Sequence, residues 1–210
     1  IDELAKGESI KSSRFLGNMV YFVTFRNTDP LFAVDVSNPE NPVIVNEVKL
    51  PGFSEYLHPY GDGLLFGLGY EADETDGKFK MSMFDISNPA DIVEVDREQL
   101  EAFYSGAMYE HRAMLVNPKR NLIGFAVEEN VIEKDGAGAN VYGRLAQIYR
   151  LYSYDENEGF VQHIECVFDL YSYDYPRANY IGDYLYIFDG ARSIYTYRLT
   201  DYEFLGITVL

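Results

Sequence analysis

Short runs in which apolar and polar residues alternate follow one another along the whole chain, and each is separated from the next by a turn. Four longer apolar runs each follow such a turn: VYFVTF after Gly17-Asn18, LLFGLG after Gly61-Asp62-Gly63, LIGFAV after residues 117–121, and YLYIFD after Gly182-Asp183. Alternation with period two, bounded by Gly, Asn, Asp and Pro, is typical of antiparallel hairpins. The pattern therefore predicts four β-hairpins.

A second pair of runs follows each hairpin: LFAVD and PVIVNEV, KMSMFD and DIVEV, QIYRLYSY and FVQHIECVF, and IYTYRL and FLGITVL. The segments that join them are SNPENP, SNPA, DENEG and TDYE, which are rich in residues that preset or tolerate turn dihedrals. The pattern therefore predicts that each copy forms a four-stranded antiparallel meander.

The first two copies carry the same turn, Asp-Val-Ser-Asn-Pro at 35–39 and Asp-Ile-Ser-Asn-Pro at 85–89. We expect the aspartate and the serine to accept nearby backbone N–H groups while the proline fixes φ. The motif then ends the third strand and directs the chain toward the fourth. This is a structural role and not a catalytic one.

The four copies cover residues of about 14–52, 53–102, 103–170 and 171–210. Four-stranded units that repeat at this interval favour an all-β fold, a β-propeller of four blades in one domain over residues 1–210. A two-layer sandwich is the competing fold, but it does not require self-similarity. Insertions are expected between the second and third strands, at Tyr70 to Lys78 and at Glu128 to Gly143.

The start of the chain predicts a fragment of a larger ring. Leu4-Ala5-Lys6-Gly7 before the first copy resembles Leu50-Pro51-Gly52 before the second, as the tail of a preceding blade would. A partial ring exposes open sheet edges, which another chain can cover. We therefore expect the chain to self-associate.

Composition narrows the partners. With 34 acidic and 17 basic residues the net charge is −17, which argues against a nucleic-acid partner because binding to phosphates needs Lys and Arg. The 19 Tyr and 14 Phe suit β-sheets. The single cysteine, Cys166, lies in an apolar run and is expected to be a buried hydrophobic residue, so the redox compartment is undetermined. Neither a membrane span nor a signal segment is visible.

The segment from Gly7 to Gly69 resembles a family of secreted bacterial and archaeal proteins that have a C-terminal β-propeller distantly related to WD repeats. The rest of the chain resembles the same family more loosely. This resemblance implies an exported, cell-surface or secreted propeller module with no assigned enzyme activity. No functional residue can be transferred from the family.

The inner strand of each blade can present one set of alternating side chains to the central channel. One set is polar: Arg14, His58, Arg112, Arg177 and Asn179. The other set is apolar and should pack between blades: Phe15, Leu57, Ala113, Leu115, Ala178 and Tyr180. The polar set predicts a basic patch able to bind a carboxylate or phosphate. Alternatively, these side chains pair with acids such as Glu55, Glu110 and Asp174.

Other candidate chemistry is weaker. The acidic segments 71–77 and 155–159 contain enough oxygen ligands for calcium but do not match an EF-hand loop, so no cofactor is expected. His58, His111 and His163 lack metal-ligand spacing, and Ser105 has no base near it in sequence. The tyrosines of Leu170 to Pro176 are either stacking platforms for a sugar or peptide or ordinary strand residues.

These observations favour a non-catalytic extracellular binding or scaffold propeller that engages a protein, peptide or glycan through the channel mouth and the Glu128 to Gly143 loop. The alternative is an extracellular hydrolase or lyase that uses Arg14, His58, Arg112 and Arg177 at the channel, an idea that depends on analogy between propellers. A His58 or His111 side chain hydrogen-bonded to a carboxylate in an open pocket would favour the enzyme.

Overall fold

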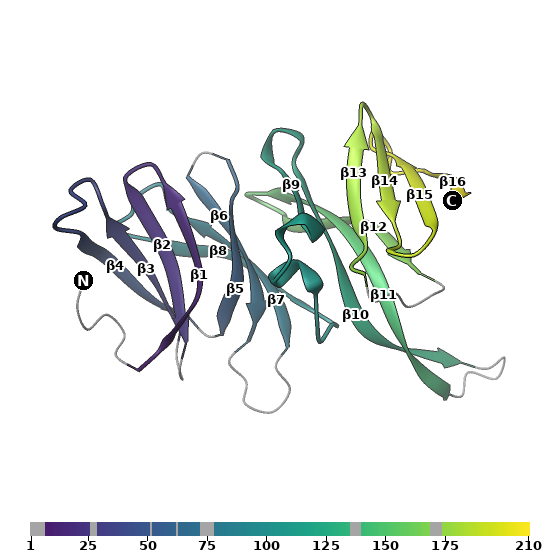
Figure 1. Cartoon of the computed structure of the whole chain (residues 1–210), viewed down its shortest axis with the longest axis horizontal. Helices are drawn as coiled ribbons and strands as arrows, with labels where there is room; N and C mark the ends of the chain where they lie inside the picture. Colours follow the sequence, from purple (N-terminus) through teal and green to yellow (C-terminus); the bar gives the residue numbers. More distant parts are fainter. Residues whose placement is uncertain are drawn as a thin grey trace. The chain divides into compact units, whose positions relative to one another are not determined.

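A computed structural model describes residues 7–25, 29–50, 52–61, 63–71, 78–134, 140–168 and 174–210. These residues form four separate four-stranded antiparallel sheets (Figure 1). The all-β fold with four meanders, predicted from the sequence, is therefore confirmed. The tail of a preceding blade, predicted at residues 1–7, lies outside the described residues except for Gly7.

Each sheet follows chain order from its inner to its outer strand. Blade 1 consists of β1 (Ser9–Leu16), β2 (Met19–Phe25), β3 (Asp29–Asp35) and β4 (Val43–Leu50). Blade 2 consists of β5 (Phe53–Pro59), β6 (Leu64–Tyr70), β7 (Phe79–Asp85) and β8 (Val93–Leu100). Blade 1 thus begins five residues before its predicted start at residue 14.

Blade 3 consists of β9 (Leu115–Asn117), β10 (Leu122–Lys134), β11 (Asn140–Asp155) and β12 (Gly159–Val167). Blade 4 consists of β13 (Arg177–Ile181), β14 (Tyr184–Phe188), β15 (Ser193–Arg198) and β16 (Phe204–Val209). Three short 3-10 helices belong to blade 3: η1 (Gly106–Met108), η2 (His111–Ala113) and η3 (Pro118–Arg120). The chain divides into two compact units, Ile1–Leu100 and Glu101–Leu210, so the single domain over 1–210 stays a prediction.

The repeated turn is built as its sequence suggests, with one change. The Asp35 carboxylate accepts the backbone N–H of Ser37 at 2.7 Å, and Asp85 accepts that of Ser87 at 2.8 Å. The second side-chain acceptor in each turn is the asparagine and not the serine. The Asn38 side chain accepts the backbone N–H of Glu40, and the Asn88 side chain accepts that of Ala90. The motif ends β3 and β7 in the same way.

Each unit has an apolar core between its two blades. In the first unit, Tyr21, Val23 and Leu31 of blade 1 pack with Leu57 and Phe84 of blade 2. In the second unit, residues of blade 3 and blade 4 pack together; they include Tyr149, Leu151, Cys166, Leu185 and Ile187. Cys166 is buried, as predicted.

One apolar inner-strand residue does not pack between blades. Phe15 was expected there with Leu57, yet its side chain is 72% exposed, whereas Leu57 is fully buried. The reason is geometric: Phe15 pairs with Val20, and these residues lie on the face of blade 1 opposite to Tyr21, which faces blade 2.

The prediction that Glu128 to Gly143 forms a loop is wrong for the described part of this segment. Strands β10 and β11 continue through it, and their pairing runs from Ile123 opposite Tyr152 to Lys134 opposite Asn140. The two strands extend beyond the ends of β9 and β12 (Figure 1). β-Branched residues such as Val127 and Val131 favour extended backbone and sustain the pairing even though acidic residues occur between them. The other expected insertion, Tyr70 to Lys78, lies outside the described residues between 72 and 77.

Within the described residues, no helix has both the length and the apolar character to span a membrane.

Candidate functional site at the inner strands

The five predicted site residues fall into two groups. Arg14 on β1 and His58 on β5 belong to the first unit, and Arg112, Arg177 and Asn179 belong to the second. Arg112 does not lie on a strand. It is part of η2, where the Glu110 carboxylate accepts the backbone N–H of Arg112 at 3.1 Å and caps the turn. The strand alternation used to select Arg112 therefore does not apply to it.

In the first unit, Arg14, Tyr56 and His58 form one cluster across the inner strands of blades 1 and 2. The Arg14 guanidinium lies 4.9 Å from the centre of the Tyr56 ring, a cation–π contact. The Tyr56 hydroxyl is 2.7 Å from His58 Nδ1. Burial, and then the Arg14 charge, lower the pKa of His58, so the imidazole is neutral at neutral pH.

Glu55, proposed from the sequence as a partner of these residues, pairs elsewhere. Its carboxylate accepts from Lys11 Nζ at 2.8 Å. In the part of the chain that the structure describes, no carboxylate lies within hydrogen-bond distance of His58. His111 is 3.7 Å from the Glu110 carboxylate and its side chain is largely exposed. The hydrogen-bonded His–carboxylate pair that would favour an enzyme is thus found at neither residue.

In the second unit, Glu110 is the centre of the charged group. Its capping bond to the Arg112 N–H lowers the pKa of the Glu110 carboxyl, and the charges of His111, Arg177 and Arg112 add to this. Arg112 and Arg177 are therefore brought near one acid. Asn179 is exposed, and its side-chain oxygen accepts the backbone N–H of Tyr180 at 2.8 Å.

The inner edge of blade 3 is interrupted over the segment that carries Glu110 and Arg112. Strand β9 pairs with β10 only from Leu122 to Gly124. A single bridge between Tyr104 and Glu128 pairs with β10 farther along. Between these two points the chain leaves the sheet as η1 and η2. Ser105 compensates for the missing pairing, since its hydroxyl donates to the Ala126 carbonyl at 2.6 Å.

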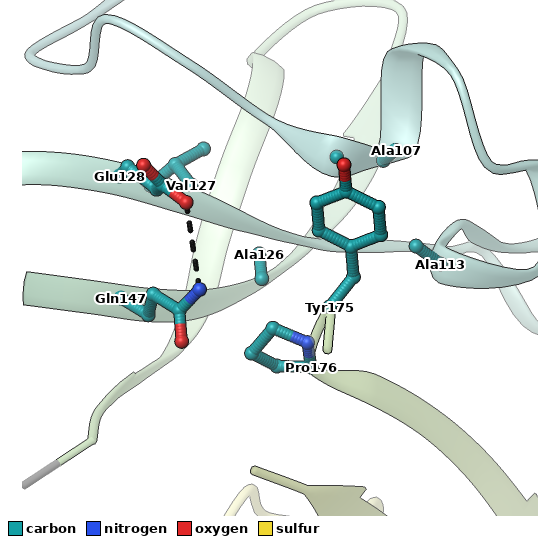
Figure 2. A pocket seen from close by; sticks show the side chains of 9 residues that line it. Ala107, Ala113, Ala126, Val127, Glu128, Gln147, Tyr175 and Pro176 are labelled. Carbon is teal, nitrogen blue, oxygen red and sulfur yellow. Dashed lines mark hydrogen bonds between the residues drawn. The ribbon is translucent and has the colours of Figure 1, made fainter. Parts of the chain in front are cut away.

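This interruption creates a pocket of about 220 Å³, including the part open to solvent. Small apolar residues, one tyrosine, one acid and one amide line it: Gly106, Ala107, Ala113, Ala126, Val127, Glu128, Gln147, Tyr175 and Pro176. Figure 2 shows Glu128 and Gln147 on one side of the Tyr175 ring and Ala113 on the other. Gln147 donates to the Glu128 carboxylate at 3.4 Å (Figure 2).

Tyr175 is held over the pocket by close packing. A Cβ added at Gly106 would overlap the Tyr175 ring, so only glycine permits this approach. The Tyr175 hydroxyl is 2.9 Å from that of Tyr104. Burial, and then this hydrogen bond, raise the pKa of Tyr104. The pocket is polar and negative at the Glu128 end. Elsewhere it is lined by Ala113 and Pro176, which are the chain neighbours of Arg112 and Arg177.

Sequence reasoning missed Gln147 and Gly106 as site residues, and it included Glu128 only as the first residue of a proposed binding loop. Glu128 was placed in a loop, and Ser105-Gly106 was considered only for a nucleophile. A signal did exist, because the alternation of polar and apolar residues fails between Ser105 and Met114. Tyr175 was considered as a stacking residue; the tyrosines at 171 and 173 lie outside the described residues.

The other candidate sites have structural partners. Asp155 accepts the N–H groups of Asn157 and Glu158, and Glu71 lies 3.4 Å from Arg97. His163 is 2.7 Å from the Ser153 hydroxyl and stacks on Tyr202. No group of three or more metal-ligating residues was found among the described positions.

The chain was compared with known proteins. It is 40% identical over 139 residues to an uncharacterised protein of Methanocaldococcus jannaschii, a match covering 62% of this chain and 22% of that protein. It is 34% identical over 199 residues to an uncharacterised protein of Archaeoglobus fulgidus, covering 95% and 27%. The chain thus matches about a quarter of the length of these curated relatives.

Among solved structures, Sqt1 from Chaetomium thermophilum is 12% identical with a TM-score of 0.44, over 95% of this chain and 58% of that one. The family model described as a β-propeller domain matches residues 1–202. With its four four-stranded blades and this match, the chain belongs to the β-propeller domain family.

Proposed function

We propose that this chain is a non-catalytic binding module that recognises a peptide segment of another protein at the inner edge of blade 3. The observation that carries the proposal is the interruption of the inner strand, which opens a pocket beside β10 where the inner strand would otherwise continue to pair. Binding residues are concentrated on irregular segments that a rigid scaffold positions, and the interrupted edge beside the continuous strand β10 is such a segment.

The lining favours a peptide over a glycan. A sugar platform needs an open aromatic face, but the Tyr175 ring covers Gly106 and its hydroxyl is bonded to Tyr104. The small apolar side chains of Ala107, Ala113 and Ala126 instead line a shallow slot that is largely open to solvent, and one aliphatic side chain can pack across it. The propeller fold by itself does not specify a ligand.

Charge favours a basic residue in that peptide. Glu128 lies at one end of the slot, and a carboxylate has lone pairs for more than one donor. The net charge of −17 raises the local concentration of cationic partners. A lysine side chain would place its aliphatic part in the slot and its ammonium group near Glu128. Export to the cell surface stays a prediction from the family resemblance.

A random-peptide display library selected against the whole chain tests the proposal. We expect enrichment of peptides that share one basic residue, and loss of their binding in Gly106→Ala, because the added Cβ displaces Tyr175. Gly143→Ala is the matched control, since the nearest atom to its added Cβ is the Val131 carbonyl oxygen at 3.9 Å.

Circular dichroism checks that both variants remain folded. Equal peptide binding by Gly106→Ala and Gly143→Ala would contradict the assignment of the pocket. A glycan array that gives ligands when the peptide library gives none would contradict the assignment of the ligand.

A further inference from the structure

Two arginines lie next to the pocket at the interrupted edge of blade 3. Arg112 on η2 precedes the pocket residue Ala113, and Arg177 at the start of β13 follows the pocket residue Pro176. Figure 2 shows Ala113 and Glu128 on opposite sides of the tyrosine ring. Because η2 packs against β13, the two arginines belong to one region of the surface. Arg112 is exposed and Arg177 is half-buried, so a ligand in the pocket can reach both.

These two guanidinium groups differ from others in the chain, which pair with acids. The paired examples are Arg97 with Glu71 at 3.4 Å, Arg150 with Glu165 at 3.1 Å and Arg198 with Asp201 at 2.7 Å. Among the residues that the structure describes, neither Arg112 nor Arg177 forms a side-chain hydrogen bond or an ion pair. Each therefore has N–H donors available for a ligand.

Glu110 is the acid that both arginines share, and it cannot neutralise them both. Its carboxylate accepts the backbone N–H of Arg112 at 3.1 Å and lies 3.7 Å from His111. The charges of Arg177 and Arg112 both act on this carboxyl group. Two guanidinium groups and one carboxylate leave an excess of at least one positive charge. The pocket thus has a negative end at Glu128 and a positive region beside Ala113 and Pro176.

We infer that Arg112 and Arg177 bind a carboxylate of the same peptide whose basic residue lies near Glu128, an inference that rests on the proposed function. The recognised segment then carries an acidic group as well as a basic one. A carboxylate has two oxygens in one plane, and a guanidinium fork matches them with paired N–H donors. Opposite charges at the two parts of the pocket also fix the direction in which the peptide binds, because the reversed peptide would bring like charges together.

Fluorescence anisotropy with a set of labelled peptides tests the inference. Each peptide has one lysine in a Gly-Ser background. A glutamate, or a glutamine of the same shape, is placed at successive positions on either side of the lysine, and the C-terminus is free or amidated. We expect the best glutamate peptide to bind the wild-type chain about fivefold more tightly than its glutamine counterpart, the scale of an exposed ion pair. A preference that instead follows the free C-terminus identifies the terminal carboxylate as the group bound.

Two variants locate the effect. Arg112→Gln and Arg177→Gln should each remove most of the preference for the carboxylate and leave binding of the glutamine, amidated peptide unchanged. Arg112→Gln keeps the backbone N–H that Glu110 caps, so η2 should remain folded. Arg192→Gln is the matched control, because Arg192 is an exposed arginine between β14 and β15 that does not line the pocket.

The outcomes separate this inference from the proposed function. Suppose that the wild-type chain binds the glutamine, amidated peptide and binds the carboxylate peptides no better. The inference is then overturned, and the lysine site stands. A preference that survives in both Arg112→Gln and Arg177→Gln would also overturn it. If the wild-type chain binds no peptide of the set, the proposed function fails and the inference fails with it.

Discussion

The inner edges of blades 2 and 3 have the same place in their sheets, but only one is a continuous strand. In blade 2, β5 pairs with β6 from Phe53 to Pro59, with one bulge near Ser54. In blade 3, β9 pairs over three residues, and the preceding segment folds into η1 and η2. Continuous pairing fills the blade 2 edge with backbone, whereas the interruption in blade 3 leaves space for a pocket.

The two edges also satisfy their backbone groups differently. Along β5, ladder hydrogen bonds serve both strands. Along β10, the hydroxyl of Ser105 replaces the missing ladder at the Ala126 carbonyl. A side chain can satisfy a carbonyl without bringing a strand alongside it, and this is how a sheet edge can be both buried and hollow.

The largest loss of stability is expected from adding a methyl group at Gly69, where strands β5 and β6 of blade 2 approach each other closely. In Gly69→Ala the new Cβ overlaps the carbonyl oxygen of Phe53, a backbone atom that cannot rotate away. We expect a loss of about 3 kcal/mol in the free energy of unfolding. Urea denaturation followed by circular dichroism measures it.

Gly106→Ala is the comparison for the blade 3 edge. Its Cβ overlaps only the Tyr175 side chain, which can move, so we expect a loss of about 1 kcal/mol. If Gly106→Ala destabilised the chain as much as Gly69→Ala, the blade 3 edge would be as tightly filled as that of blade 2.

A smaller effect is expected from Ser105→Ala. The substitution removes the donor to the buried Ala126 carbonyl and the acceptor of the Ala107 N–H. Leaving such a group unsatisfied costs about 1–2 kcal/mol. Urea denaturation measures this cost, and hydrogen exchange should increase along β10.

Ser13→Ala is the matched control, because Ser13 is an exposed serine on the inner strand β1 of blade 1, outside the inner edges of blades 2 and 3. Its effect should stay within about 0.5 kcal/mol. Equal stability of Ser105→Ala and Ser13→Ala would show that the hydroxyl of Ser105 does not replace the ladder.

The continuous parts of the fold could be read from the sequence because their causes are local. Alternation sets the faces of a strand, and Asp35 and Asp85 bind N–H groups only two residues away. The blade count and the meander followed from these signals. The long β10–β11 hairpin was missed because its acids and glycines were taken as loop signals, although Val131 and Ile132 continue a strand pattern.

The pocket could not be predicted in the same way because its parts are distant in sequence. Tyr175 lies 71 residues from its hydrogen-bond partner Tyr104, and its approach to Gly106 depends on blade 4 packing beside blade 3. The capping residues Ser105 and Glu110 were visible locally, and they would have warned that Arg112 is not on a strand. Arg14 and His58 each contact Tyr56, a residue that the strand alternation did not single out.

The smallest expected effect is a difference in the pH range over which each edge loses stability. Burial and Arg14 hold the pKa of His58 below its ordinary value of 6.5. As the pH falls below 6.5, the unfolded chain therefore binds a proton at His58 more readily than the folded chain does. The contribution of the blade 2 edge to the free energy of unfolding decreases in that range. The capping bond to Arg112 and nearby positive charges hold the pKa of Glu110 below its ordinary 4.5. Stability from the blade 3 edge is present above pH 4.5 and is lost as the pH falls through the folded pKa.

Titration of the two side chains by NMR distinguishes these windows. His58 should titrate below pH 6.5 and Glu110 below pH 4.5. In Arg14→Gln the pKa of His58 should increase toward 6.5 because a repelling charge is lost, and that of Glu110 should not change, since Arg14 is not among the charges that act on it. A His58 that titrates at its ordinary pKa of 6.5 would mean that the continuous edge is open to water. The two edges would then differ less than their strand pairing indicates.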